Sequence, residues 1–329
     1  MKAIIWTKYG PPDVLQLKEV EKPLPKNHEV LIKVNATTVT VGDCELRSLK
    51  GPILFRLPMR LYIGFSKPKR ITILGQELAG EIEAIGEDVT RFRKGDQVFG
   101  WTGLRLGAYA EYICFPEDGV LAIKPSNMTY EEATTLPVGG LEAVHFLRNS
   151  NIQSGEKVLI NGAGGSIGTF AVQLARYFGA KVTAVDSTEK LDMLRSIGAD
   201  QVIDYAQEDF TKSGETYDVI YDVIGKSSFS QSLDLLKQNG RYLLGNPGLS
   251  LRVRGRSTSM RYGKKVLLWE GSRTPDDINF LKQLIEAGKI KPVIDRHYPM
   301  EQIAEAHHYV ETGQKKGNVV ITMGHSNKT

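Results

Sequence analysis

The stretch Lys157–Gly168 (KVLINGAGGSIG) combines residue types that can hold a phosphate group. Glycines let a backbone approach an anion closely, and a helix that follows them offers free N–H groups and the positive end of its dipole. Ala163, Gly165 and Gly168 fit the pattern GxGxxG, with Ala in place of the first Gly. Asp186 follows eighteen residues after Gly168, where an acid can bind an adenosine ribose. Together these residues indicate a dinucleotide-binding turn.

The segments around this turn are those that must position it. Lys157–Ile160 is a short apolar run typical of a buried parallel strand, and the apolar residues of Ser166–Phe178 recur at helical spacing. Lys181–Val185 is the next strand candidate. Further strand candidates are Gln201–Asp204, Asp218–Tyr221, Arg241–Gly245 and Lys265–Trp269. Helical patterns separate most of them, which predicts an α/β unit with a doubly wound parallel sheet of the Rossmann type.

The turn and the residues after the second and third strands are the candidate cofactor contacts. They are Gly162, Ala163, Gly164, Gly165, Ser166, Ile167, Gly168, Asp186, Ser187, Thr188, Lys190 and Tyr205. An acid at Asp186 repels a 2′-phosphate and favours NAD, whereas Ser187, Thr188 and Lys190 could hold that phosphate and favour NADP. Asp186 could instead cap the following helix, and Tyr205 could be an ordinary exposed tyrosine.

Length and composition fit a globular protein with two domains. The chain has 329 residues, of which 41% are hydrophobic and 24% charged, and its formal net charge is +4. Its two cysteines, Cys44 and Cys114, are too few for a disulfide framework or a multi-cysteine metal lobe. No charged-then-apolar leader precedes the first strand, and no apolar run reaches membrane-spanning length. We therefore expect a cytoplasmic protein without a membrane partner.

The first third of the chain has the pattern of a small β structure. Met1–Thr7 and Leu15–Glu21 alternate like paired strands, Glu29–Ala36 alternates more strongly, and a short helix is expected around Asp43. In Ile73–Trp101, glycines recur at positions that suit bulges and turns. This pattern predicts a strongly bent β-barrel.

Two stretches are basic and contain no acid. Arg47–Arg70 holds seven Lys or Arg residues interleaved with apolar ones, and is either a lid or anion-binding surface, or a solvated loop whose apolar residues contact the core. Leu251–Lys265 holds six, and could bind cofactor phosphates, an acidic partner or RNA, or be a solvated loop. It lacks the aromatic spacing of a nucleic-acid platform, so we do not expect a nucleic-acid partner.

Several of these motifs agree with one family. The segments ILGQELAGEIEAIG, LPVGGLEAVHFL, NGAGGSIGTFAVQLAR, YDVIYDVIG and TGQKKGNVVI together resemble the medium-chain dehydrogenase/reductase superfamily. This resemblance implies a GroES-like barrel domain made of residues 1–122 and 273–329, and a Rossmann domain made of residues 123–272. It also implies a homodimer formed through the edge strand Lys265–Trp269.

The resemblance also bears on metal binding. Zinc alcohol dehydrogenases of this superfamily have a histidine at the position of Gln76, and their first zinc cysteine falls near Thr40 or Val41. An amide oxygen is a poor zinc ligand, and the Trp101–Gly107 segment leaves no room for a structural zinc lobe. Cys44 could be invoked as a ligand, but a small buried residue is the usual state of a free cysteine. We therefore expect no metal site, as in the zinc-independent quinone oxidoreductase branch.

The same resemblance assigns further residues to the site. Barrel residues expected to face the nicotinamide, as catalytic candidates, are Thr40, Asp43, Gln76 and Trp101. Thr40 and Trp101 could instead only pack, and Asp43 could only cap the short helix. Glu142 stands where relatives commonly have Thr near the nicotinamide ribose. Gly245 ends the fifth strand, and Asn246 directly after it is the likelier neighbour of the nicotinamide. Relatives of this branch mostly use NADPH, which opposes the preference that Asp186 suggests.

A hydride acceptor that needs no Lewis acid is already electrophilic, as quinones and conjugated carbonyls are. The sequence therefore predicts a zinc-independent NAD(P)H-dependent oxidoreductase that transfers hydride to a quinone or an α,β-unsaturated carbonyl. One alternative is an alcohol dehydrogenase or carbonyl reductase with non-standard metal ligation. The other is a non-enzymatic nucleotide- or RNA-binding protein on the same scaffold.

Overall fold

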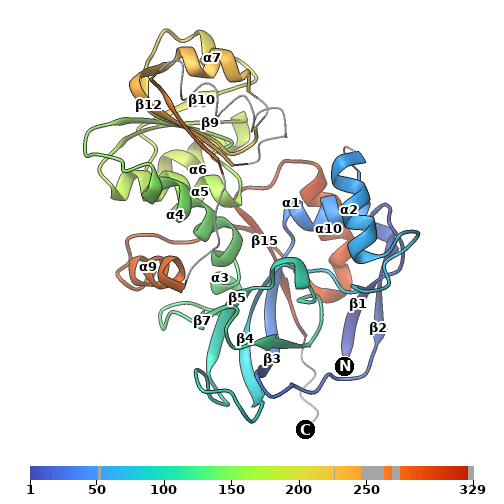
Figure 1. The fold of residues 1–329 in the computed structure, drawn as a ribbon. Coiled ribbons are helices and arrows are strands. Elements are labelled where there is room, and N and C mark those ends of the chain that lie inside the picture. The colour runs from blue at the N-terminus through green and yellow to red at the C-terminus, as the bar shows by residue number, and fades with distance from the viewer. Residues whose placement is uncertain (51–52, 226, 246–262, 269–274, 325–329) are drawn as a thin grey trace. The chain divides into compact units, whose positions relative to one another are not determined.

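The computed structural model describes residues 1–50, 53–225, 227–245, 263–268 and 275–324 (Figure 1). The chain divides into a first unit, Met1–Val138 with Ile294–Thr329, and a second unit, Gly139–Val293. These boundaries differ from the predicted 1–122 with 273–329 and 123–272. One reason is that α3 (Tyr130–Ala133) contacts the barrel strands β3 and β4, and another is that α9 (Pro275–Glu286) packs on α4 (Leu141–Asn149).

The first unit is a bent, mainly antiparallel β structure. Its larger sheet has the order β14-β15-β3-β4-β5-β7, and β6 pairs with β3. These strands are β3 (Glu29–Thr38), β4 (Glu77–Ile85), β5 (Gln97–Trp101), β6 (Tyr112–Pro116), β7 (Val120–Ile123), β14 (Ile294–Pro299) and β15 (Asn318–Thr322). The predicted hairpin forms from β1 (Lys2–Trp6) and β2 (Leu15–Glu19). The prediction of a barrel is confirmed, whereas strand β14 was not predicted.

Glycine at position 80 allows the strong bend of this sheet. A Cβ at Gly80 would lie 2.1 Å from the backbone oxygen of Lys33 on the paired strand β3. The pairing of β3 with β4 shifts register between Val34 and Ala36, which marks a bulge beside this contact. Aliphatic residues of both strands, with Trp6 from β1, fill the core inside the bend.

Helix α1 (Val41–Ser48) begins where β3 ends, as predicted. Its residue Arg47 is only 1% exposed, pairs with Glu311 at the end of α10 (Ile303–Glu311), and donates from Nε to the oxygen of Gly10 at 3.1 Å. Because a buried guanidinium without a counter-charge is costly, this contact holds α1 and α10 together. It joins residues 264 positions apart, which no local pattern could indicate.

We expect Glu311→Gln to lower the free energy of unfolding by about 2 kcal/mol, less than for a fully buried pair, because the Glu311 side chain is 37% exposed. Urea titration followed by circular dichroism measures the change. The matched control is Glu305→Gln, an exposed acid of the same helix, which should shift stability by less than about 0.5 kcal/mol. Equal urea midpoints for the two variants would show that the Arg47 contact contributes little.

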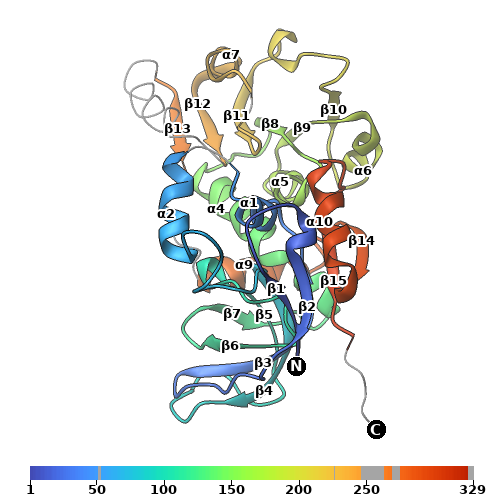
Figure 2. The ribbon, with the colours of Figure 1, turned by 90° about the vertical axis from the view of Figure 1, so that its right-hand side faces the viewer.

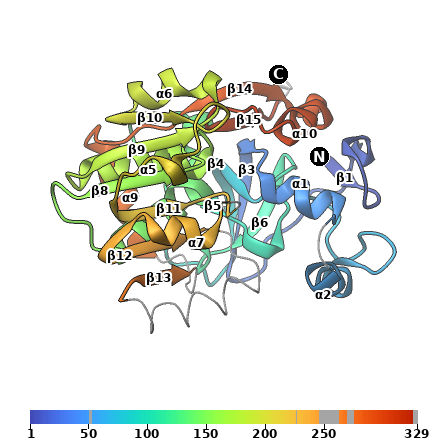
Figure 3. The same cartoon turned by 90° about the horizontal axis from the view of Figure 1, so that it is seen from above.

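The segment predicted to be a lid or a solvated loop contains a helix instead. Helix α2 (Ile53–Ile63) lies at the periphery of the first unit (Figure 3). Several of its apolar residues are exposed rather than turned to the core, among them Leu61 at 71%. The loop prediction failed because Pro58 and the interleaved cations mask the helical spacing of two apolar faces.

The second unit is a parallel sheet of six strands in the order β10-β9-β8-β11-β12-β13. Figure 2 shows these strands side by side, from β13 at the left to β10 at the right. They are β8 (Lys157–Asn161), β9 (Lys181–Asp186), β10 (Gln201–Asp204), β11 (Tyr217–Asp222), β12 (Leu236–Leu244) and β13 (Lys265–Leu268). Further α-helices among the described residues of this unit are α5 (Ser166–Tyr177), α6 (Leu191–Ser196) and α7 (Phe229–Asp234). The prediction of a doubly wound parallel sheet is confirmed.

Some predicted features fall outside the described residues. These are Asn246, most of the basic stretch 251–265, and Trp269 at the end of the predicted edge strand. In the part of the chain that the structure describes, no helix is long and apolar enough to cross a membrane.

Candidate functional site

The glycine turn after β8 has the tight geometry that its sequence predicts. Gly162 adopts φ +83°, a conformation that favours glycine. A Cβ at Gly168 would lie 2.3 Å from the oxygen of Gly162 and 2.5 Å from Cα of Ala163. Helix α5 therefore packs against the turn only because position 168 lacks a side chain. Gly165 precedes α5 without a side-chain cap, which suits a bound phosphate at this helix end.

Asp186 is bonded to the turn itself. Its Oδ2 accepts a hydrogen bond from the backbone N of Gly164 at 2.7 Å, and its Oδ1 accepts one from the N of Ser187 at 2.9 Å. Lys190 Nζ lies 3.0 Å from the same Oδ1, and the Lys190 side chain is 9% exposed. The acid, the lysine and the glycine turn thus form one cluster. The carboxylate does not cap the short helix Thr188–Lys190, whose side-chain cap is absent.

A second acid, Asp204, lies beside Asp186 and was not among the predicted residues. The parallel pairing of β10 with β9 places Asp204 opposite Asp186. Its carboxylate accepts hydrogen bonds from the Thr188 hydroxyl, and from the N of Ala206 at 3.0 Å. These bonds hold the pKa of Asp204 below its ordinary value. The signal in the sequence is that the third strand, like the second, ends in an acid.

The other predicted cofactor residues of this edge lie on helix α4 (Glu142) and directly after strands β12 (Gly245) and β10 (Tyr205). Glu142 of α4 comes close to Gly245, since a Cβ on Gly245 would lie 3.2 Å from Glu142 Oε1. Tyr205 is 55% exposed, next to Asp204. Asp222, at the end of β11, is buried and accepts hydrogen bonds from Asn161 Nδ2 at 3.0 Å and from the N of Gly225 at 2.9 Å. The carboxyl ends of parallel strands meet at one edge, which is where such sheets bind nucleotides.

In the barrel unit, Thr40 and Asp43 form a reciprocal pair. The Thr40 hydroxyl donates to Asp43 Oδ2 at 2.6 Å, and the backbone N of Asp43 donates to Thr40 Oγ1 at 3.0 Å. Asp43 Oδ1 also accepts a hydrogen bond from the N of Gly75 at 3.2 Å. The pair is a capping box for α1, so the capping alternative for Asp43 is confirmed. Burial of Asp43, which is 0% exposed, raises its pKa to about 6.

Gln76 extends this pair. Its Nε2 donates to Thr40 Oγ1 at 3.4 Å, and it reaches this position because residue 42 is glycine: a Cβ there would lie 2.6 Å from Nε2. Trp101 is placed differently. It ends β5, pairs with Glu77 across the strands, and its ring lies 3.6 Å from the position of a Cβ on Gly103. The structure therefore links Gln76, Thr40 and Asp43 by hydrogen bonds, with Trp101 outside that chain of bonds.

Cys44 lies in contact with His307. Its Sγ lies 3.3 Å from Nδ1 of His307, and both side chains are buried. Burial raises the pKa of the Cys44 thiol, and it lowers the pKa of His307 to about 3. The two side chains are therefore a neutral pair at physiological pH. Within the described residues, no group of three or more His, Cys, Asp or Glu side chains could hold a metal ion.

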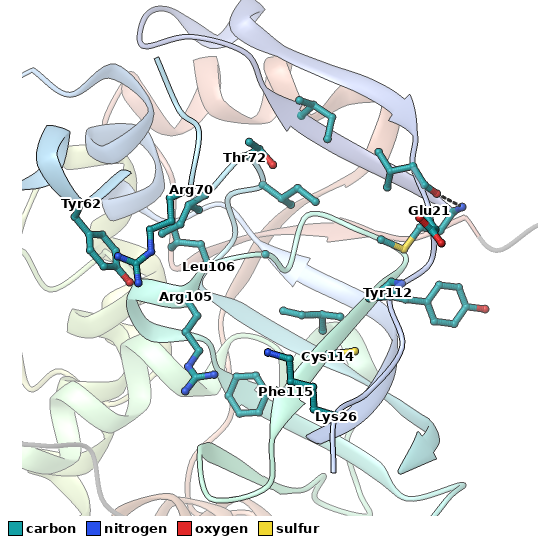
Figure 4. A pocket seen from close by; sticks show the side chains of 18 residues that line it. Glu21, Lys26, Tyr62, Arg70, Thr72, Arg105, Leu106, Tyr112, Cys114 and Phe115 are labelled. Atoms are coloured by element: carbon teal, nitrogen blue, oxygen red, sulfur yellow. Dashed lines mark hydrogen bonds between the residues drawn. The ribbon is translucent and has the colours of Figure 1, made fainter. Parts of the chain in front are cut away.

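A cavity of about 880 Å³ lies elsewhere in the first unit (Figure 4). Its lining includes the cations Lys26, Arg70 and Arg105, together with apolar residues such as Leu106 and Phe115. None of the proposed cofactor or catalytic residues lines it. The cavity is therefore separate from the candidate site.

Comparison with known proteins identifies the family. Residues 26–125 match the alcohol dehydrogenase GroES-like domain, and residues 197–321 match the zinc-binding dehydrogenase family. The 2-methylene-furan-3-one reductase of Solanum lycopersicum is 31% identical over 344 residues, which cover 98% of this chain and 79% of that protein. The chain belongs to the medium-chain dehydrogenase/reductase superfamily.

Other members of the superfamily place the chain in its quinone oxidoreductase-like branch. The chloroplastic NADPH-dependent alkenal/one oxidoreductase of Arabidopsis thaliana is 31% identical, with 98% of this chain and 79% of that protein covered. The structure of the quinone oxidoreductase from Coxiella burnetii superposes with a TM-score of 0.87 at 28% identity, covering 98% of this chain and 99% of that one. The predicted resemblance is therefore confirmed, and the chain is an oxidoreductase of this type that uses a nicotinamide cofactor.

Proposed function

We propose that this protein is a zinc-independent, NAD(P)H-dependent reductase of quinones or α,β-unsaturated carbonyls. The observation that carries the proposal is the hydrogen-bonded set Gln76–Thr40–Asp43, in which Gln76 stands where zinc alcohol dehydrogenases have a histidine ligand and Thr40 lies near the position of their first zinc cysteine. It offers an amide and a hydroxyl that are held in place by hydrogen bonds to each other and to α1. Relatives named for the reduction of a methylene-furanone, of alkenals and of quinones support the same substrate class.

For this reaction the barrel residues need to supply only hydrogen-bond donors and a proton. Hydride adds to the β-carbon of an enone, and the electron pair of its C=C bond moves toward the carbonyl, giving an enolate. The enolate oxygen needs hydrogen-bond donors rather than a Lewis acid. We assign this role to Gln76, whose amide N–H groups lie beside Thr40, and a packing role to Trp101, the remaining barrel candidate.

The proton that completes the reduction comes, in this proposal, from Thr40 backed by Asp43. Thr40 is 8% exposed while Asp43 is fully buried, so the hydroxyl is the member of the pair that a substrate can reach. When Asp43 is protonated, its carboxyl O–H can replace the Gln76 N–H as a donor to Thr40 Oγ1, while Thr40 donates its own proton to the enolate. A proton then leaves Thr40 for the product and another leaves Asp43 for Thr40. After product release, Asp43 is reprotonated along the same path.

For the cofactor, we propose a preference for NADH. Asp186 and Asp204 place two carboxylates at the ends of adjacent strands, and each repels a 2′-phosphate. Lys190 is the opposing cation, but it is paired with Asp186 at 3.0 Å. The glycine turn and α5 would hold the pyrophosphate, whereas Glu142 and Gly245 would border the nicotinamide ribose.

The proposed independence of zinc has a direct test. We expect the purified enzyme to hold well under one zinc per chain by elemental analysis, and to keep its rate of enone or quinone reduction within about twofold after EDTA treatment. The physical reason is that the buried Cys44 thiol contacts His307 and that the amide of Gln76 is a poor zinc ligand. Stoichiometric zinc whose removal abolishes turnover would instead support an alcohol dehydrogenase with unusual ligands.

We also propose a cytoplasmic homodimer. Among the described residues, β13 is the outermost strand of the parallel sheet, and strands in this position can pair with a second copy across a two-fold axis. The unpaired thiols of Cys44 and Cys114 suit a reducing compartment. Light scattering after gel filtration tests the dimer: a mass of one chain at micromolar concentration would contradict it.

A further inference from the structure

Helix α2 is apolar on two opposite sides. On its inner side, Ile63 is 1% exposed and belongs to the barrel core, while Met59 and Tyr62 pack partly buried against that core. On its outer side, four residues remain exposed. They are Ile53, Leu54, Leu57 and Leu61, at 77%, 64%, 48% and 71%.

These outer residues form one continuous face. At about 100° of rotation per residue, the four fall within an arc of about 100°, opposite the arc of the three inner residues. Phe65, just after the helix, is also 64% exposed. A helix that is apolar on both sides is normally covered on both, and an exposed apolar patch of this kind marks an interaction surface.

The segment that carries this face is basic. The segment from Arg47 to Arg70 contains seven Lys or Arg residues and no acid. Of these, Lys50, Arg56, Lys67, Lys69 and Arg70 are exposed. Arg60 is engaged within the protein, since its Nη1 donates to the oxygen of Phe65 at 2.8 Å. An outward apolar face flanked by cations is the pattern of a helix that lies in the plane of a membrane interface.

The cations continue into the neighbouring cavity. The Arg70 guanidinium lies 4.7 Å over the ring of Tyr62, near the end of α2, and both side chains line the cavity shown in Figure 4. Arg105 and Lys26 add two more cations to that lining, against the acid Glu21. Positive charge therefore extends from the helix into a concave surface beside it.

A second copy of this chain is a poor occupant for this face. An isologous contact would set the basic segment against its own copy, and like charges facing each other across a two-fold axis oppose association. An anionic surface has the complementary charge. We propose that the outer face of α2 binds peripherally to an anionic lipid bilayer, with its leucines at the acyl boundary and Arg56, Lys67 and Lys69 near lipid phosphates. The sequence indicates no membrane partner because no run could span a bilayer, but an interfacial helix need not span.

The test is co-sedimentation of the full chain with sucrose-loaded vesicles. We expect binding to vesicles of phosphatidylglycerol and phosphatidylcholine, little binding to phosphatidylcholine alone, and release by added salt. Leu57→Ser with Leu61→Ser should weaken binding at least about tenfold. Arg56→Gln, Lys67→Gln and Lys69→Gln together should weaken it by about 100-fold.

Matched control variants distinguish binding through this face from non-specific binding of the protein to vesicles. Leu24→Ser with Leu104→Ser removes two exposed leucines of the same unit, and Lys8→Gln, Lys18→Gln and Lys94→Gln remove three exposed cations. Both control variants should bind within about twofold of the unmodified protein. Failure of the unmodified chain to bind anionic vesicles, or equal loss with the controls, would overturn the proposal. So would conversion of a dimer to a monomer by the Leu57/Leu61 variant, because the face would then be a contact between copies.

Discussion

Replacing Thr40 with valine is expected to lower kcat for enone or quinone reduction by about 10²- to 10⁴-fold, the range for loss of a positioned proton donor. Valine matches threonine in shape but has no proton to give, and it also leaves Asp43 Oδ2 without the 2.6 Å hydrogen bond. Thr40→Ser should retain most of the activity. Asp43→Asn should lose activity to a similar extent because the amide cannot resupply the proton.

The pH dependence follows from the same pair. The proton-donating form requires neutral Asp43, and burial raises the pKa of Asp43 to about 6. Above that pH the carboxylate ionises and holds the Thr40 proton, so kcat for reduction should fall as pH rises through about 6. Asp43→Asn should remove this inflection.

Thr102→Val is the matched control for Thr40. Thr102 is also a buried threonine, and its hydroxyl donates to the oxygen of Gly75 at 3.0 Å, beside the segment that contacts Asp43. Its loss should change kcat by less than about threefold. If Thr40→Val behaves like Thr102→Val, solvent rather than Thr40 provides the proton.

Asp186→Ser is expected to raise the ratio of kcat/KM for NADPH to that for NADH by about 10- to 100-fold. The substitution removes a charge that repels a 2′-phosphate, and this repulsion is on the order of 1.4–2.8 kcal/mol for partly screened charges. It also frees Lys190, now held at 3.0 Å from Asp186 Oδ1, to bind that phosphate.

Two further variants test whether Lys190 contributes to this change and whether the change is specific to Asp186. Adding Lys190→Met to Asp186→Ser should remove most of the gain for NADPH, which a purely repulsive role of Asp186 would not predict. Asp192→Ser, an exposed acid of α6 with a side chain 99% exposed, should leave the cofactor ratio within about twofold. An unchanged ratio in Asp186→Ser would contradict the role assigned to this acid.

The glycine turn could be predicted from sequence because its signals are local. The strand, the glycines and the helix follow one another within Lys157–Tyr177, and each has its own pattern. Asp204 was not predicted as a site residue because its position beside Asp186 results from the parallel pairing of β10 with β9. The contact of Arg47 with Glu311 escaped for the same physical reason, since only the folded barrel unit brings α1 to α10.

The candidate residues of the barrel unit could be named from the sequence, but the hydrogen bonds that join them could not. Thr40 was a candidate for catalysis or for packing, and Asp43 for catalysis or for capping, and the structure joins them in a capping box. These roles are compatible, because the cap fixes the hydroxyl that would move the proton. Helix α2 was mistaken for a loop because its outer apolar face has no partner within the described structure, and sequence periodicity assumes one buried face.

The most direct test of the proposed function is the steady-state oxidation of NADH by the purified protein with EDTA present. An ortho-quinone and a conjugated enone serve as acceptors, and oxidation of simple alcohols with NAD⁺ is measured in parallel. We predict turnover with at least one electrophilic acceptor, faster with NADH than with NADPH, and little alcohol oxidation. Zinc-dependent alcohol oxidation without turnover of either acceptor would contradict the proposed function.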